Sequence, residues 1–131
     1  MQQQINNLSL NKRLAKECLD MIFNQKDPNG AVAKYISPTY RQHNPHAPDG
    51  PEGVIEYASG YIKANPNLRL EFKRFIAEGD LVAVHSFLKP NSSDLGRSVV
   101  DIFRVENSRL AEHWDVMQPI PLQTANRNGM F

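Results

Sequence analysis

Three ionisable side chains near the C-terminal end of the sequence have the right types to perform acid–base chemistry together: Asp101, His113 and Asp115. A carboxylate can remove a proton from a carbon next to a carbonyl group if it lies where water is excluded, because burial makes it a stronger base. The enolate that forms then needs hydrogen-bond donors at its oxygen. We take Asp115 as the candidate base and His113 as the group that orients it. Asp101, if protonated, is a candidate donor to the enolate.

The pattern around these residues predicts two β-strands joined by a tight turn. Polar and apolar residues alternate over 101–105 and again over 109–117, with turn-forming residues at 106–108. Successive residues of a strand point to opposite faces, so a two-residue loop would separate the two aspartates, whereas a three-residue loop would bring them together. We expect the three-residue loop, with Ser108 in the left-handed conformation that glycine adopts more easily. The shared face would then hold Asp101, Phe103, Val105, Ala111, His113 and Asp115, and the other face Ile102, Leu110, Trp114 and Val116.

Other side chains are candidates for contacting a substrate beside these acids. The segment 40–45, YRQHNP, is a run of hydrogen-bonding side chains before a proline, which is unusual for simple secondary structure. His113 itself, His43 or Asn44 of this segment, or His85 in an apolar strand further on could donate to the enolate oxygen. The candidate substrate-binding residues are Tyr40, His43, Asn44, His85 and Phe103.

The same residues also have structural explanations. The two aspartates could be ordinary strand acids bonded to an arginine or to water, and His85 could be a core histidine with satisfied hydrogen bonds. The tyrosines Tyr40, Tyr57 and Tyr61 are expected to pack their rings, with hydroxyl groups at a pocket rim or in solvent. Two histidines three residues apart in a proline-rich loop are a weak metal motif, so we expect no metal. The alternative is a zinc or iron site built from His43, His46, His85 and Asp115.

The order of the remaining elements predicts a single α+β domain over residues 1–131. Helical patterns precede strand patterns, and helices that come before antiparallel hairpins indicate this class. Residues 1–7 are expected to be loose and residues 118–131 to form an irregular tail. The expected helices are 8–25, 28–36 and 51–64, and the expected strands are 68–76, 81–88, 97–105 and 109–117.

Composition narrows the function classes. The chain has a net charge of +1 and no dense basic patch, which argues against nucleic-acid or membrane-surface binding. No apolar run approaches the roughly 20 residues that span a bilayer, and the N-terminus lacks the apolar core of a signal peptide, so the cytoplasm is the expected location. The single cysteine, Cys18, rules out an intrachain disulfide and is expected to be a buried, inert thiol. An outer sheet face bearing Trp114 and Val116 would need covering, which favours a homodimer packed through the sheet.

Two segments give the chain a recognisable resemblance: YRQHNP at 40–45 and DIFRVENSRLAEHWDVMQPIP at 101–121. In their order with the helices, from about residue 10 to 121, they resemble the SnoaL-like polyketide cyclase family of the nuclear transport factor 2-like superfamily. The sequence is most similar to bacterial proteins described as SnoaL-like aldol-condensation enzymes. The resemblance implies a cone-shaped α+β barrel in which three helices pack on a curved, mainly antiparallel sheet around an apolar pocket. It also implies a homodimer and catalysis without a metal or organic cofactor.

The resemblance places Asp115 at the position of the carboxylate that starts aldol cyclisation in the characterised cyclases, and Asp101 where those cyclases carry a histidine. We therefore expect an enzyme without a cofactor that acts next to the carbonyl of a small apolar molecule, by aldol cyclisation, isomerisation or dehydration. The superfamily also contains ligand binders without activity, so a non-catalytic binding or dimerisation module is the alternative. A further alternative is a hydrolase that activates water between the two aspartates.

Overall fold

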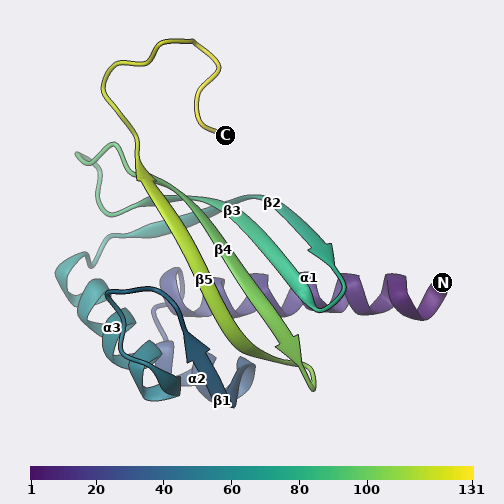
Figure 1. The fold of residues 1–131 in the computed structure, drawn as a ribbon. Helices are drawn as coiled ribbons and strands as arrows, with labels where there is room; N and C mark the ends of the chain where they lie inside the picture. Colours follow the sequence, from purple (N-terminus) through teal and green to yellow (C-terminus); the bar gives the residue numbers. More distant parts are fainter.

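Three helices pack against a curved five-stranded sheet in the computed structural model, which describes residues 1–131 (Figure 1). The strand order is β1-β5-β4-β3-β2, in which β1 runs parallel to β5 and every other pair is antiparallel. The predicted fold of three helices on a curved, mainly antiparallel sheet is confirmed, and the sheet stays open with β1 and β2 at its edges. The elements are α1 (Gln2–Phe23), α2 (Pro28–Tyr35), β1 (Ile36–Gln42), α3 (Gly50–Ala64), β2 (Arg69–Glu78), β3 (Leu81–Lys89), β4 (Arg97–Glu106) and β5 (Arg109–Pro119).

The first helix begins earlier than predicted. α1 starts at Gln2, so residues expected to be loose are helical. Its buried stripe includes Leu14, Cys18 and Ile22, which face the sheet. Cys18 is fully buried, as predicted, and burial together with the nearby charge of Asp101 raises the pKa of its thiol. None of the helices is long and apolar enough to cross a membrane.

Two aspartates fix the starts of the shorter helices. Asp27 accepts a hydrogen bond from the backbone N–H of Gly30 (2.9 Å), which caps α2 as predicted. Asp49 caps α3 through the N–H of Gly50 (2.9 Å) and also accepts the N–H of Gln42 at the end of β1 (2.8 Å). Asp49 therefore ties the end of β1 to the start of α3 and fixes the loop between them.

The turn between β4 and β5 contains two residues, so the three-residue prediction is wrong. Glu106 pairs directly with Arg109, and the residues between them, Asn107 and Ser108, have φ angles of 51° and 59°. Positive φ at both central positions is the geometry of a type I′ turn, whose twist matches that of the flanking strands.

An extra residue in β5 returns the two aspartates to one face despite this turn. The register shifts after Arg104, and Ala111 has no partner in β4. Such a bulge sets two residues of one strand against one of its neighbour. Without it, Asp101 would lie opposite Trp114, whereas in the structure it lies opposite Asp115. The predicted shared face therefore exists, produced by a bulge in place of a longer turn.

The bulge also corrects the predicted position of Leu110. This side chain is fully buried in the core, opposite Val105, because it precedes the extra residue. Ile102, Trp114 and Val116 do lie on the outer face, where Val116 is 71% exposed.

A second bulge, at Lys73 in β2, adds to the bend of the sheet. The register shifts between Phe72 and Arg74, so Phe75 and Ala77 pack against the core while Ile76 is 64% exposed. Because bulges increase local twist and bend a strand, the two irregularities help to curve the sheet around the helices.

Candidate active site

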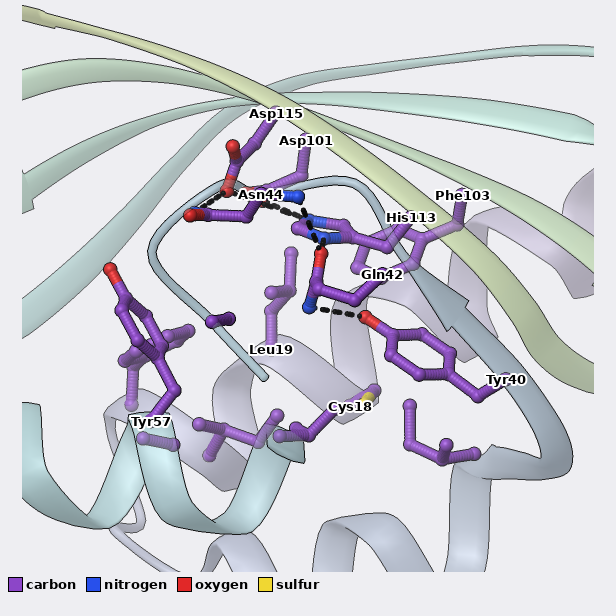
Figure 2. A pocket seen from close by; sticks show the side chains of 16 residues that line it. Cys18, Leu19, Tyr40, Gln42, Asn44, Tyr57, Asp101, Phe103, His113 and Asp115 are labelled. Atoms are coloured by element: carbon purple, nitrogen blue, oxygen red, sulfur yellow. Dashed lines mark hydrogen bonds and ion pairs between the residues drawn. The ribbon is translucent and has the colours of Figure 1, made fainter. Parts of the chain in front are cut away.

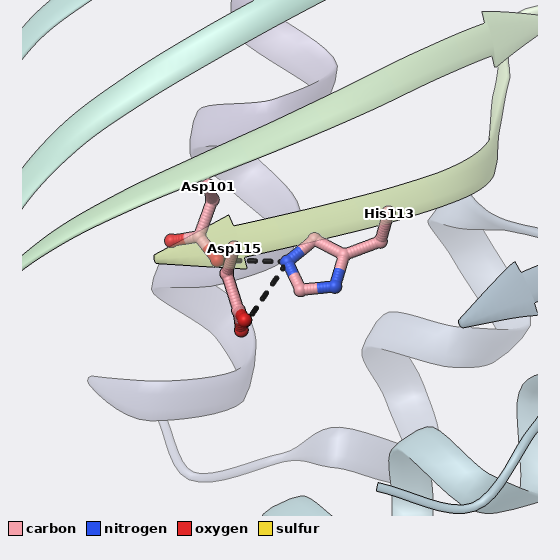
Figure 3. Close-up of side chains that lie close together, drawn as sticks. All are labelled: Asp101, His113 and Asp115. Atoms are coloured by element: carbon pink, nitrogen blue, oxygen red, sulfur yellow. Dashed lines mark hydrogen bonds and ion pairs between the residues drawn. The ribbon is translucent and has the colours of Figure 1, made fainter. Parts of the chain in front are cut away.

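The two aspartates and the histidine meet on the concave face of the sheet. Asp101 and His113 are each 7% exposed, and the side chain of Asp115 is 11% exposed. The Nε2 atom of His113 lies 2.8 Å from Asp101 Oδ1 and 3.9 Å from Asp115 Oδ2 (Figure 3). The strand register thus brings the three candidate catalytic residues into one cluster.

Strand β1 and the residues that follow it add two amide side chains to this cluster, those of Gln42 and Asn44. The strand lies beside β5, with Gln42 opposite His113, and the N–H of His43 donates to the His113 carbonyl (3.0 Å). Tyr40, Gln42 and Asn44 alternate along the chain and all line the same pocket (Figure 2). Gln42 is a site residue that sequence reasoning missed. The period-two spacing of the candidates Tyr40 and Asn44 would have indicated it.

The hydrogen bonds of Gln42 fix which nitrogen of His113 carries a proton. Gln42 Oε1 accepts the backbone N–H groups of His43 (3.1 Å) and Asn44 (3.0 Å), so this atom must be the amide oxygen. The same oxygen lies 2.7 Å from His113 Nδ1, which must therefore be a donor. Gln42 Nε2 in turn donates to the hydroxyl of Tyr40 (3.0 Å).

A proton must consequently lie between His113 and Asp101. Since Nδ1 of His113 is protonated, its Nε2 either donates to Asp101 as an imidazolium or accepts from a protonated Asp101. Both arrangements leave the pair with one shared proton across the 2.8 Å contact.

Asp115 is held differently. Asn44 Oδ1 accepts the N–H of His46 (2.8 Å), which fixes Nδ2 as the atom that donates to Asp115 Oδ2 at 2.7 Å. This hydrogen bond holds one oxygen of the carboxylate in place. The second oxygen of Asp115 accepts no hydrogen bond from the protein, so it is free to take a proton.

These groups line one end of a pocket of about 510 Å³, a volume that includes its open mouth. Most of the lining side chains are hydrophobic; Cys18 and Leu19 of α1 and Phe103 of β4 are among them (Figure 2). Tyr57 of α3 also lines the pocket. Burial and the charge of Asp115 raise the pKa of its hydroxyl, which keeps it a neutral donor. The sequence predicted only that the Tyr57 ring would pack, with its hydroxyl at a pocket rim or in solvent, and did not place Tyr57 among the site residues.

Comparison with known proteins identifies the family. The model of the SnoaL-like polyketide cyclase family matches residues 13–126. This chain belongs to the SnoaL-like polyketide cyclase family. No match was found among the curated proteins.

Solved structures with the same SnoaL-like architecture include TsrD from Streptomyces laurentii, at 24% identity and a TM-score of 0.71 over 83% of this chain and 88% of that one. AclR from Streptomyces galilaeus, a provisionally assigned hydroxylase, has 25% identity and a TM-score of 0.73 over 88% and 83%. A provisionally assigned ketosteroid isomerase from Kribbella flavida has 17% identity and a TM-score of 0.72 over 93% and 87%. Identities at this level establish the shared fold, and the chemistry must be argued from the site.

Within this SnoaL-like pocket Asp101 is paired with a neighbouring imidazole. The resemblance to the cyclases implied a histidine at this position, and here His113 of the next strand supplies the ring at 2.8 Å. Phe103 lies opposite His113 on the neighbouring strand, and their ring centroids are 4.8 Å apart, so the aromatic ring packs against the imidazole.

Two of the predicted substrate-binding residues lie outside the SnoaL-like pocket. His43 points away from it, bonds Glu112 at 2.7 Å and stacks on Trp114 with 5.0 Å between ring centroids. His85 lies on the outer, half-buried face of β3, where it contacts Arg74 and Ser98. Both placements follow from strand alternation, since the residues on either side of each histidine face inward.

The predicted alternative metal set is not assembled, because His43 and His85 lie away from Asp115. The groups that could offer ligand atoms to a metal are Asp101, His113 and Asp115, whose candidate atoms lie within 4.8 Å of one another. In the structure the Nε2 atom of this histidine is already engaged by Asp101.

Proposed function

We propose that this protein is a cofactor-independent acid–base enzyme that acts next to the carbonyl group of a small apolar molecule, by aldol cyclisation, isomerisation or dehydration. One observation carries the proposal: the Asp115 carboxylate is anchored through a single oxygen inside an apolar pocket, beside a proton shared by His113 and Asp101. A base that is held in place, largely buried and free at one oxygen meets the geometric requirement for removing a proton from carbon.

The roles divide between the strands and the helix. Asp115 Oδ1 takes the proton, and the electrons of the carbon–hydrogen bond move to the carbonyl oxygen. Both ring nitrogens of His113 are engaged, and the Asn44 amide is directed at Asp115 and Tyr57, so the donor that remains for the developing enolate is the hydroxyl of Tyr57. The proton shared by His113 and Asp101 offsets the negative charge that collects in the pocket.

A ligand-binding module without chemistry is the second candidate. It is favoured by the direct pairing of Asp101 with His113, because a buried pair of this kind can serve structure alone. The hydrolase alternative needs a polar cavity around its water, and it is less favoured because most of the side chains that line the pocket are hydrophobic.

The test uses hydrogen exchange at carbon and does not require the natural substrate. Small apolar ketones and β-keto esters are incubated with the protein in D₂O, and deuterium uptake next to the carbonyl is followed by NMR. We expect Asp115→Asn to reduce protein-catalysed exchange by about 10²–10⁴-fold, the usual contribution of a general base. Because asparagine has nearly the same shape, thermal unfolding should show that the fold is retained.

The matched control is Asp80→Asn, which changes an exposed acid in the β2–β3 turn. This variant should catalyse deuterium uptake into the probes at the wild-type rate. Undiminished exchange in the Asp115 variant would remove this residue from the mechanism. Absence of exchange in the wild-type protein across the whole panel would favour the binding module.

A further inference from the structure

The acids lie at the junction of two hollows, and the second one contains the side chains of Arg97 and Tyr61, which do not line the first. This second hollow, of about 440 Å³ including its mouth, extends from Asp101 and Asp115 between α3 and the far half of the sheet. It shares both aspartates and Tyr57 with the first pocket. A molecule that spans the two hollows would therefore pass directly over Asp115.

Two polar groups that line the second hollow have no partner within the protein. The hydroxyl of Tyr61 is buried and makes no hydrogen bond. Arg97, at the start of β4, forms neither an ion pair nor a side-chain hydrogen bond, whereas Asp101 and His113 are bonded to each other within the chain. An unsatisfied buried hydroxyl is costly and calls for an explanation, and a missing ligand is a common one.

These groups also act on one another. Tyr57 and Tyr61 lie one helical turn apart on α3, with their rings nearly parallel and 6.4 Å between centroids. Burial raises the pKa of both hydroxyls, so they remain protonated donors, and the positive charge of Arg97 opposes that rise at each of them. The geometry agrees, since Arg97 and both tyrosines line the same hollow.

A guanidinium beside neutral phenol donors is a binding set for an anionic oxygen. Arginine presents a planar fork of N–H groups that matches a carboxylate in two hydrogen bonds. Asp115 stands at the other end of the hollow, so repulsion from its charge would keep an anionic group at the far end, against Arg97.

We propose that the second hollow is the subsite for a carboxylate carried by the ligand, bound by Arg97 and the Tyr61 hydroxyl. This makes the ligand class an apolar oxo acid, with its carbonyl end beside Asp115 and its carboxylate at Arg97. The orientation of the carbonyl end rests on the proposed function, whereas the carboxylate subsite itself does not.

The test measures binding and needs no turnover. Three probes share one apolar body: 4-phenylbutyrate, the neutral 4-phenylbutyramide of nearly the same shape, and 4-phenylbutanol. Dissociation constants are determined by calorimetry for the wild-type protein and for Arg97→Gln and Tyr61→Phe. We expect the wild type to bind the carboxylate about tenfold or more tightly than the amide, as charge-assisted contacts to arginine allow.

Arg97→Gln should reduce that preference to near unity, and Tyr61→Phe, which keeps the guanidinium, should reduce it in part. Tyr61→Phe should leave the unfolding temperature of the free protein unchanged or slightly raised, because it removes a hydroxyl that has no partner. The control Arg69→Gln removes a positive charge from an exposed position at the start of β2 and should keep the preference. This control separates a local site from a change in net charge.

Equal affinity of the wild type for carboxylate and amide would overturn the subsite, and so would a preference that survives in Arg97→Gln. If Arg97→Gln fails to fold, the result for Tyr61→Phe decides the question by itself. An unchanged preference for the carboxylate over the amide in Tyr61→Phe would then overturn the proposal. Failure of the exchange assay would count against the catalytic proposal alone, because the carboxylate preference is measured without any reaction.

Discussion

The substitution Gln42→Leu tests the hydrogen-bonding argument on which the description of the site depends. Leucine has a similar length but cannot accept the N–H of Asn44 or the Nδ1–H of His113. The N–H of His43 keeps a second acceptor, the His113 carbonyl at 3.0 Å. Two donors are therefore left without partners, one on the backbone and one on the His113 imidazole, and the buried hydroxyl of Tyr40 loses the N–H that it accepts.

The expected cost follows from those two donors. A buried donor without an acceptor costs about 1–3 kcal/mol, and Gln42 is half-buried, so water can replace part of what is lost. We expect the free energy of unfolding to fall by about 2–4 kcal/mol. In a domain of this size that lowers the melting temperature on the order of 10 °C.

Thermal and urea unfolding measure the stability, and nitrogen-15 NMR of labelled histidine reports the proton on the ring. In the wild type, Nδ1 of His113 should carry a proton, and in the variant this assignment should no longer be fixed. The control Gln25→Leu removes an exposed hydrogen bond to Asp20 and should change stability by less than about 0.5 kcal/mol. A wild-type signal showing Nδ1 without a proton would refute the reasoning, as would equal costs for the two leucine variants.

Two further predictions concern the turn and the core. Ser108→Gly should stabilise the protein by about 0.5–1 kcal/mol, measured by urea unfolding, because glycine adopts the positive φ of a type I′ turn without the strain of a side chain; an unchanged or lower stability would contradict this account of the turn. Cys18 should react with a thiol reagent at pH 8 only at the rate of unfolding, because burial and the charge of Asp101 raise the pKa of its thiol. Rapid labelling of the folded protein would show that the thiol is accessible.

Local signals in the sequence were sufficient for the three helices and the four antiparallel strands, but they did not predict β1, whose first residue, Ile36, was assigned to the end of the second helix. Asp27 before Pro28 marks the start of α2 through capping, and alternating apolar residues mark the four antiparallel strands. α1 extends further toward the N-terminus than predicted, since residues 1–7 have few apolar positions to show a periodicity. Rules that act over a few residues could therefore predict the fold class but not every boundary.

The candidate site depended on longer-range geometry. Asp101, His113 and Asp115 were expected on one face, and they are, but through a bulge at Ala111 that no glycine or charge in the sequence marks. Gln42 joins them because β1 lies parallel to β5, a pairing between segments far apart in the chain. The choice of His43 went wrong for a local reason, since it neighbours Asn44 and adjacent strand residues cannot both point into one pocket.

The bulge at Ala111 has a consequence for how this hairpin can change through insertions and deletions. Whether Asp101 and Asp115 face each other depends on whether the chain between them holds an odd or an even number of residues. Deletion of one residue in the hairpin would exchange the two faces of the end of β5. Trp114 would then point inward, and His113 and Asp115 would both point to solvent. Loss of Ala111 together with gain of one residue in the turn would leave the site intact. The length of the turn and the presence of the bulge must therefore change together if Asp101 and Asp115 are to stay on one face.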